Sequence, residues 1–281
     1  MSKPTRPPLR YHGGKWRVAD RIIELMPPHM TYVEPFGGGA GVLLRKSRSK
    51  NEIYNDLDGD IVNVFRVLRD PVDSAKLIQL LELTPFAREE MKLGWEDTDD
   101  PVEQARRCIV RSHMGFGSAG ATKGRTGFRG LDRCEASFSA PAKQWDALPD
   151  HLHAIITRMK GVVIENMEAE RLIDTVDHEG TFFYVDPPYL PETRSSMDSG
   201  TKYYRHEMTA EDHEQLLKKL LQVNGMVLLS GYDSDLYNDM LKDWRMISFD
   251  ARASSKAGTV IRKECVWISP NAEQPNLFNI W

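Results

Sequence analysis

The sequence predicts an α/β fold built around a parallel sheet, because short strand-like runs alternate with helical patterns over most of the chain. The strand-like runs are rich in β-branched and aromatic residues, and most of them are expected to be buried parallel strands. They cover residues 31–34, 52–55, 162–165, 181–185, 226–230 and 264–268. The helical patterns cover residues 17–26, 41–49, 60–68, 168–176 and 209–223. The last helix is expected to begin at a capping box formed by Thr209 and Asp212.

The alternation of strands and helices is interrupted between about residues 71 and 160. A charged, helical stretch there leads into residues 112–130, which are dense in glycine and arginine. We interpret this region as a mainly helical module inserted between two halves of one sheet. The chain would then consist of a discontinuous α/β domain over 1–70 and 156–270, an insertion over 71–155 and a C-terminal tail over 271–281.

The composition is that of an ordinary globular protein and excludes fibrous, disordered and membrane-spanning classes. The 281 residues suffice for one large domain with an inserted module, and 41% of them are hydrophobic. No run approaches the roughly 18 uncharged apolar residues of a membrane span. Cys108, Cys134 and Cys265 are odd in number and far apart, so neither a disulfide framework nor a zinc site is predicted. We therefore expect a soluble, cytoplasmic protein with reduced thiols.

The charge is unevenly distributed along the chain, although the net value is only -4. Residues 1–50 contain ten basic and three acidic side chains, and residues 104–133 contain seven basic and one acidic. The acidic overall balance argues mildly against a nucleic-acid partner. The two basic regions nevertheless allow phosphate binding, and charge alone leaves equally open that they are solvated helix faces.

The first motif with chemical meaning follows the predicted strand 31–34, where Glu34-Pro-Phe-Gly37-Gly-Gly39-Ala-Gly leads into a predicted helix. A glycine-rich turn lets the backbone approach a ligand at the carboxyl end of a strand, where nucleotide-like cofactors bind in open α/β sheets. The next strand delivers Asp56, a carboxylate placed to accept hydrogen bonds from ribose hydroxyls. The glycines do not fit the phosphate-binding loop G-x-x-x-x-G-K-[ST]. The alternative is a tight turn beside a surface acid.

The second motif is Asp186-Pro187-Pro188-Tyr189, which follows the apolar strand 181–185. Proline lacks an N–H group and stiffens the chain, so a proline carbonyl is available to face a ligand. Asp186 and this carbonyl then present two acceptors at one spot, beside the flat ring of Tyr189. Such a receptor suits a planar base with an exocyclic amine, whose delocalised lone pair would be localised for attack by two acceptors. A plain turn at the end of the strand is the alternative.

Together with Tyr11-His-Gly13-Gly14-Lys15, these motifs resemble those of the Dam-type (D12 class) DNA adenine-N6 methyltransferases. The order is also similar: the Gly-Gly-Lys element, the glycine-rich loop, an insertion that recognises the target, and then Asp-Pro-Pro-Tyr. The resemblance covers nearly the whole chain. It implies a Rossmann-like methyltransferase sheet, S-adenosylmethionine as methyl donor, no metal, and double-stranded DNA as the substrate, methylated at N6 of an adenine.

The resemblance also implies roles for individual residues. Tyr11 and Lys15 would contact the methionine part of the cofactor, Asp56 would hold the ribose, and Asn166 would lie near the cofactor adenine. Asp186 and the carbonyl of its neighbouring proline would accept from adenine N6, with the tyrosine of the motif stacked on the base. The expected cofactor site comprises Tyr11, Gly13, Gly14, Lys15, Glu34, Pro35, Phe36, Gly37, Gly39, Asp56, Asn166 and Asp186, and the expected catalytic set is Asp186, Pro187, Pro188 and Tyr189.

An adenine inside a duplex cannot reach this receptor, so the target base has to be flipped out while the DNA backbone is held. Residues 112–129 alternate glycines with basic and aromatic side chains, which suits a loop that contacts phosphates and a groove. The expected DNA contacts are Arg10, Lys123, Arg125 and Arg129. Residues 203–208 are expected to close over the flipped nucleotide, whereas His113, His206 and His213 are expected to be ordinary histidines.

The C-terminal residues Gln274-Pro-Asn-Leu277-Phe278 resemble peptides that bind the bacterial sliding clamp, and an extended tail with two apolar anchors suits a groove. A tail that is loose or packed on the domain is the alternative. Two other functions stay open: methylation of another base amine, cytosine N4 or a base in RNA, and DNA binding without turnover. Asp186 favours adenine, because cytosine-N4 enzymes usually have Ser at the start of this motif.

Overall fold

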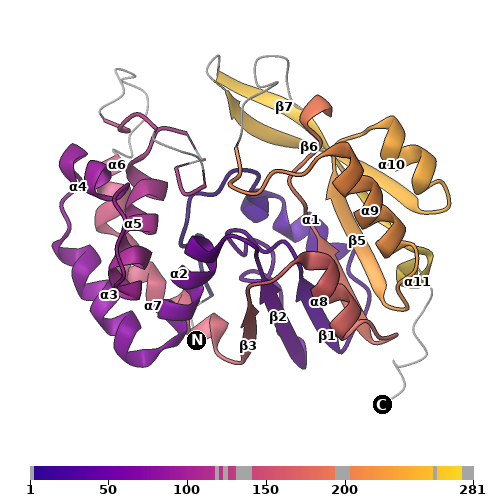
Figure 1. Ribbon diagram of the computed structural model, residues 1–281, viewed down its shortest axis with the longest axis horizontal. Coiled ribbons are helices and arrows are strands. Elements are labelled where there is room, and N and C mark those ends of the chain that lie inside the picture. The colour runs from indigo at the N-terminus through magenta and orange to yellow at the C-terminus, as the bar shows by residue number, and fades with distance from the viewer. Residues whose placement is uncertain are drawn as a thin grey trace.

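The computed structural model describes residues 3–117, 120–122, 126–130, 141–193, 203–255 and 258–273. Its centre is a seven-stranded sheet with the strand order β3-β2-β1-β4-β5-β7-β6 (Figure 1). The strands are β1 Thr31–Glu34, β2 Asn51–Asn55, β3 Val162–Glu165, β4 Thr181–Val185, β5 Met226–Gly231, β6 Arg245–Ser255 and β7 Gly258–Ile268. Strands β1 to β5 pair in parallel, which confirms the predicted fold class.

Two features of the sheet differ from the expectation. The predicted strand 264–268 is the end of β7, which runs antiparallel to both β5 and β6. Strand β6 itself was not predicted. It lies at the edge of the sheet, paired only with β7 in the sheet order, and its sequence begins with Arg245-Met-Ile-Ser-Phe-Asp. Ile247 and Phe249 pack on the core from this strand, whereas Met246 is exposed, so the apolar run is short and the signal is weak.

The strand order reverses between β1 and β4, because β2 and β3 are added on one side of this point and β5 on the other. These two strands are neighbours, with Val33 opposite Phe183, although some 150 residues separate them in sequence. A ligand site in an open α/β sheet forms at such a switch point, outside the carboxyl ends of the strands. The glycine-rich loop follows β1 and the Asp-Pro-Pro-Tyr tetrapeptide follows β4. The topology therefore brings the two predicted motifs to one place.

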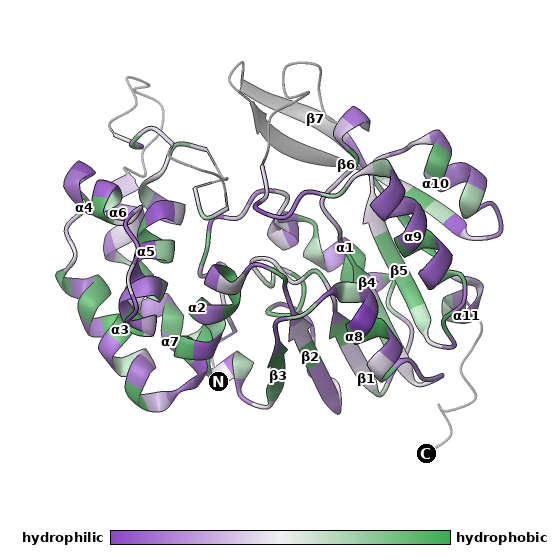
Figure 2. Cartoon of the chain, viewed as in Figure 1, coloured by the Kyte–Doolittle hydropathy of each residue, from purple (hydrophilic) through white to green (hydrophobic). Residues whose placement is uncertain are grey.

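Each face of the sheet has its own core, because successive residues of a strand point to opposite faces. In β4, Phe182 and Tyr184 belong to one core, and Phe183 and Val185 to the other. Helices α1 Ala19–Glu24, α2 Gly59–Arg69 and α11 Pro270–Glu273 contribute to the first core; α8 Ala169–Val176, α9 Ala210–Leu220 and α10 Asp235–Met240 contribute to the second. Strand β5 is apolar along its length, whereas the outer side of α9 is polar (Figure 2).

The inserted region forms a helical lobe beside the β3 edge of the sheet (Figure 1). Its helices are α3 Pro71–Leu83, α4 Arg88–Leu93, α5 Pro101–Met114, α6 Pro141–Asp146 and α7 Leu148–Met159. Helices α3 and α5 begin in the same way: Asp70 and Asp100 cap the first turn and a proline follows, which is a strong helix start. The first core continues into this lobe through Leu77, Ile109 and Leu152. Helix α7 crosses the predicted boundary at residue 155.

The predicted helices agree with the structure except at residues 41–49. The capping box of α9 is confirmed, because Thr209 and Asp212 exchange side-chain and backbone hydrogen bonds. Residues 41–46 instead form turns, so the prediction of a helix there is wrong. The Leu43 N–H donates to the Glu34 carboxylate at 2.7 Å and not to a carbonyl one turn earlier. Among the described residues, no helix is long and apolar enough to cross a membrane.

Candidate active site

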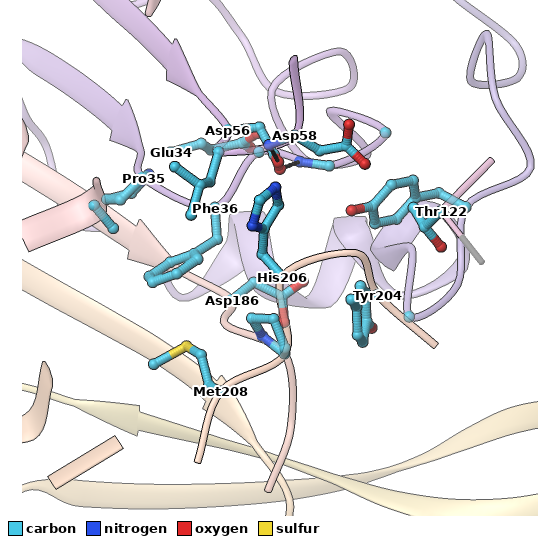
Figure 3. A pocket seen from close by; sticks show the side chains of 18 of the residues that line it. Glu34, Pro35, Phe36, Asp56, Asp58, Thr122, Asp186, Tyr204, His206 and Met208 are labelled. Carbon is cyan, nitrogen blue, oxygen red and sulfur yellow. Dashed lines mark hydrogen bonds between the residues drawn. The ribbon is translucent and has the colours of Figure 1, made fainter. Parts of the chain in front are cut away.

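A pocket of about 390 Å³ lies at the carboxyl ends of β1, β2, β3 and β4. Its walls come from the Gly-Gly-Lys element, the loops that follow these strands and residues 203–208, called the wall segment below. Figure 3 shows Phe36 and Met208 on one side of the pocket and Thr122 and Tyr204 on the other. Of the expected cofactor residues, the pocket is lined by Tyr11, Gly13, Gly14, Lys15, Glu34, Pro35, Phe36, Gly37, Gly39, Asp56 and Asp186.

The glycine-rich loop packs so closely on its neighbours that side chains do not fit. A Cβ atom on Gly37 would lie 2.2 Å from the Tyr54 ring, and one on Gly38 would lie 2.6 Å from the Tyr11 ring. Gly38 also has a φ of 47°, in the left-handed region that favours glycine. The Tyr54 hydroxyl donates to the Gly38 carbonyl at 2.7 Å and fixes the turn. The loop backbone therefore forms the floor of the pocket.

Glu34, the last residue of β1, organises the loop from beneath. Its side chain is buried and accepts hydrogen bonds from the Tyr32 hydroxyl at 2.6 Å and the Leu43 N–H at 2.7 Å. Burial raises the pKa of the Glu34 carboxyl to about 7. The charged form is stabilised only by these two donors and by the more distant Lys46. Glu34 is thus a buried acid at the edge of the pocket.

Asp56 is the carboxylate predicted to hold a ribose. Its two oxygens accept from the Gly38 N–H at 2.8 Å and the Asp58 N–H at 2.8 Å, so the carboxylate joins the loops after β1 and β2. Burial raises the pKa of Asp56 to about 6. Asn166 does not line the pocket: its amide donates to the carbonyls of Asp56 and Leu57 and supports this loop from behind. Met167 and Glu168, the next residues, line the pocket instead.

Lys15 and Asp186 form the charged centre of the site. The Lys15 ammonium is 2.8 Å and 3.0 Å from the two Asp186 oxygens, and it donates to the Gly13 carbonyl at 2.8 Å. Burial alone would lower the pKa of Lys15, but the carboxylates of Asp186 and Glu264 together raise it above its ordinary value. Burial raises the pKa of Asp186 to about 6, although Lys15 opposes this shift. Lys15 therefore stays protonated, whereas Asp186 can take up a proton at mildly acidic pH.

Of the other residues of the Asp-Pro-Pro-Tyr tetrapeptide, only Pro188 lines the pocket. Pro187 is buried, and Tyr189 is half-buried behind the pocket. The Tyr189 ring packs edge-on against Tyr232, with centroids 4.6 Å apart, and its hydroxyl donates to Glu264. Asp186 thus stands between the pocket and the tyrosine ring.

The wall segment contributes residues that sequence reasoning did not assign to a cofactor site. Tyr204, Arg205 and His206 all line the pocket, and Figure 3 shows His206 between Asp56 and Asp186. The histidine was expected to be an ordinary one. The sequence signal for these residues was the cluster of aromatic and basic side chains just before the capped helix. The sequence does not show that this cluster faces the pocket, because its position depends on the path of the chain after β4. The other two histidines, His113 and His213, are buried and hydrogen-bonded.

The expected DNA-contacting residues are only partly described by the structure. The Arg10 N–H donates to the Ser112 hydroxyl, and burial together with nearby Arg129 lowers the pKa of Arg10 to about 10. Its Nη1 atom is buried and has no hydrogen-bond partner among the described residues. Arg129 donates to the Gln144 amide oxygen at 3.2 Å. The residues outside the described ranges are Lys123, Arg125 and the predicted clamp-binding residues Gln274, Leu277 and Phe278.

Several other basic side chains of the two basic regions form ion pairs within the fold. Arg106 and Arg107 on α5 pair with Glu103, at 2.6 Å and 2.8 Å respectively. Arg111 reaches Asp60, 3.0 Å away on α2. The described part of the second basic region is therefore largely neutralised by acids of the same lobe and of α2. Within the described ranges, no group of three or more acidic, histidine or cysteine side chains is arranged to hold a metal, and Cys108 and Cys265 are buried thiols.

The strand order, the glycine-rich loop at the switch point and the Asp-Pro-Pro-Tyr element beside it define a methyltransferase of the Rossmann-like α/β class. The family model of the D12 class N6 adenine-specific DNA methyltransferases matches residues 11–95 and 130–254. Because the match covers well over half of the chain, the protein belongs to this family. It is an S-adenosylmethionine-dependent enzyme that methylates adenine at N6 in specific DNA sites.

Relatives with similar sequences carry matching names. A Type II methyltransferase from Lactococcus lactis subsp. cremoris is 25% identical over 268 residues, covering 90% of this chain and 90% of the relative. A Type II methyltransferase from Methanocaldococcus jannaschii is 26% identical over 267 residues, covering 86% and 89%. The DNA adenine methylase of Haemophilus influenzae is 25% identical over 253 residues, covering 83% of each chain.

Proposed function

We propose that the pocket binds S-adenosylmethionine and that a flipped adenine enters on the Tyr189 side of Asp186. The observation that carries this assignment is the direct contact between Lys15 and Asp186 at the switch point of the sheet. Lys15 would bind the cofactor carboxylate together with Tyr11, and Asp56 would accept from the ribose hydroxyls. Asp186, with the Pro187 carbonyl, would accept from the N6 amine of the base.

The polar groups of the pocket fit this cofactor. S-adenosylmethionine has a sulfonium cation, an ammonium group and two ribose hydroxyls, all of which favour acidic surroundings. Eight acidic residues line the pocket: Glu34, Asp56, Asp58, Glu168, Glu170, Asp186, Glu207 and Asp212. One oxygen of Asp58 is buried and accepts no hydrogen bond within the described residues, which suits a hydroxyl donor from a ligand. Phe36 and Met208 supply the apolar side that a purine ring needs.

The chemistry assigned to the protein side chains is hydrogen-bond acceptance and positioning. The bound cofactor supplies an electrophilic methyl group on sulfur. Asp186 and the Pro187 carbonyl would accept from the adenine N6 amine, localise its lone pair and orient it for attack on that methyl group. Formation of the N6–methyl bond would be balanced by loss of the bond from the methyl group to sulfur and by release of one N6 proton to water. The ionised form of Asp186 is required, because a protonated carboxyl cannot use both oxygens as acceptors.

The assignment of Asp186 is tested by Asp186→Ala. This variant should transfer no methyl group from labelled S-adenosylmethionine to unmethylated genomic DNA, because it lacks the acceptor of the base amine. DNA binding, measured by gel shift, should stay close to that of the wild type. Asp174→Asn, a change at an exposed acid of α8 that pairs with Lys219, is the matched control and should retain activity. An active Asp186→Ala protein would refute the proposed mechanism.

We further propose the division of labour suggested by the sequence. Residues 1–70 and 156–270 would form the catalytic domain, and residues 71–155 would recognise the DNA target through Arg10 of the neighbouring segment and through Lys123, Arg125 and Arg129. The target would be double-stranded DNA in the cytoplasm, and the reaction would need no metal. The names of the Type II relatives support a role in restriction and modification.

Binding of the sliding clamp through Gln274, Leu277 and Phe278 stays a prediction of the sequence. A pull-down with the purified clamp tests it. Deletion of residues 271–281 should abolish capture if the tail is the binding peptide, and unchanged capture would refute this prediction.

Methylation in cells, mapped by sequencing of N6-methyladenine with and without this gene, would identify the recognised DNA site.

A further inference from the structure

Glu264 is a buried acid that approaches the charged centre of the site from the antiparallel part of the sheet. Its side chain is 8% exposed. The neighbouring residues Cys265 and Trp267 belong to the second core, whereas Val266 belongs to the first. The alternation of side chains along β7 therefore directs Glu264 toward the same side as Val266. The family-model match ends at residue 254, so Glu264 lies outside it.

Glu264 contacts Tyr189 and Lys15, the two side chains that lie next to Asp186 in the site. Its Oε1 atom accepts a hydrogen bond from the Tyr189 hydroxyl and is 3.5 Å from the Lys15 ammonium. The same ammonium is 2.8 Å from Asp186 and lies 4.7 Å from the centre of the Tyr189 ring. One lysine, one tyrosine and two carboxylates from three separate parts of the sequence thus form a compact group.

The hydroxyl contact fixes the orientation of an aromatic ring. The Tyr189 hydroxyl oxygen lies on the axis about which the ring rotates (χ2), so its hydrogen bonds to Glu264 and Asp186 fix the direction of the ring axis. Bonds to charged acceptors are the stronger kind. The edge-on contact with Tyr232 limits rotation of the ring about that axis. A fixed ring presents a fixed face to a flipped base.

The contact with Lys15 affects how well Asp186 accepts a hydrogen bond. An ammonium paired with one carboxylate alone draws electron density from it and weakens it as an acceptor for a base amine. Glu264 is a second carboxylate near the same ammonium, so Lys15 pairs with two carboxylates and withdraws less electron density from Asp186. Asp186 then keeps its acceptor strength while Lys15 stays charged and available for a ligand carboxylate.

We propose that Glu264 is a positioning residue of the methyl-transfer site, which orients Tyr189 against the flipped adenine and shares Lys15 with Asp186. The proposal rests on the proposed function of this pocket. It assigns to β7 a part in the reaction step rather than in cofactor binding. Loss of Glu264 should therefore reduce kcat while leaving the KM for the cofactor unchanged.

The test compares Glu264→Gln with wild-type enzyme, using labelled S-adenosylmethionine and unmethylated genomic DNA. Glutamine keeps the size of the side chain and removes its charge. We expect kcat to fall about 10- to 100-fold, the size of effect expected for loss of one hydrogen bond to a charged group. The KM for the cofactor should stay within about twofold, because Glu264 does not line the pocket and Lys15 keeps its pairing with Asp186. Glu264→Asp keeps the charge and should recover part of the rate.

A double-mutant cycle separates positioning through the tyrosine from general damage. Tyr189→Phe keeps the ring and removes only the hydroxyl. If Glu264 acts through that hydroxyl, Glu264→Gln should cost clearly less in the Tyr189→Phe background than in the wild type. Additive effects, a kcat equal to that of the wild type, or a rise in KM that accompanies the loss of rate would overturn the proposal.

A buried glutamate elsewhere in the sheet provides the control for structural damage. Glu52 is 3% exposed, pairs with Lys46 and Arg158, and lies near the amino end of β2, away from the pocket. Glu52→Gln should lower the melting temperature without changing kcat of the folded enzyme. Should the wild type itself transfer no methyl group to DNA, the proposed function fails first; an active wild type with an equally active Glu264→Gln variant refutes only the role of Glu264.

Discussion

The Lys15 ammonium lies 2.8 Å from a carboxylate oxygen of Asp186, 171 residues further along the chain. This contact joins the Gly-Gly-Lys element, which precedes the sheet, to the tetrapeptide that ends its central strand β4. Both side chains are largely buried, and each stabilises the charge of the other: Asp186 raises the pKa of Lys15, and Lys15 opposes the rise in the pKa of Asp186. In the proposed assignment, the pair therefore makes the cofactor side and the base side of the site electrostatically dependent on each other.

The rate of methyl transfer should depend on pH through Asp186. Burial raises the pKa of Asp186 to about 6, and the titratable groups that interact with it include Lys15, Glu264, Tyr189, Tyr184, Glu34 and Tyr237. The ionised carboxylate is the acceptor, so its fraction and the rate should fall as the pH drops through about 6. Single-turnover rates between pH 5 and 9, at saturating DNA and cofactor, measure this. A rate that stays constant down to about pH 5 would contradict the assignment.

Asp56→Asn should weaken cofactor binding. The amide cannot accept from the Gly38 and Asp58 N–H groups through both of its arms, and it replaces a charged acceptor for the ribose by a neutral one. The expected loss is about 10-fold or more in affinity for S-adenosylhomocysteine, measured by calorimetry.

Asp100→Asn is the control for that experiment. Asp100 also accepts from two backbone N–H groups, but at the start of α5 in the inserted lobe. It should change stability and leave the affinity for S-adenosylhomocysteine unaltered. Equal affinities of the Asp56→Asn and wild-type proteins would show that Asp56 does not bind the ribose.

Gly37→Ala should destabilise the fold and the pocket together. The added Cβ atom would lie 2.2 Å from the Tyr54 ring and 2.9 Å from the Asn55 carbonyl oxygen, which is backbone and cannot move aside. We expect a loss of about 2 kcal/mol in the free energy of unfolding, seen as a lower melting temperature. In Gly59→Ala the nearest atom is 3.7 Å away, so this variant should melt like the wild type. Similar melting temperatures for both variants would argue that the loop adapts freely.

Arg205→Ala should loosen the wall segment. The Arg205 guanidinium donates to Asp58 at 3.0 Å and to Asp60 at 2.7 Å, which ties this segment to the start of α2. Its loss should raise the KM for the cofactor about fivefold to tenfold while kcat changes less, because the wall segment lines the pocket proposed to hold the cofactor. Arg205→Lys should recover only part, since lysine cannot bridge two carboxylates in one plane. Lys218→Ala, at an exposed ion pair on α9, should leave KM unchanged.

The strands and the motifs of this protein could be predicted from the sequence because they depend on local patterns. Parallel strands buried on both faces are continuous apolar runs, as in Thr181–Val185, and the capping box of Thr209 is complete within four residues. The tetrapeptide starting at Asp186 and the acid at Asp56 follow directly from these strands. The helix expected at residues 41–49 is absent, because residues 41–45 form turns held partly by a long-range bond from the Leu43 N–H to the Glu34 carboxylate, which local patterns do not contain.

Local sequence patterns were enough to predict the α/β class, the two motifs at strand ends and the family to which they belong. Which groups meet depends on the three-dimensional fold. Asn166 supports the Asp56 loop instead of lining the pocket, the arginines of α5 pair with nearby acids, and Glu264 reaches Tyr189 from an antiparallel strand. Contacts of this kind depend on strand order and direction, which hydrophobic periodicity does not contain, because the same alternation of side chains fits either direction.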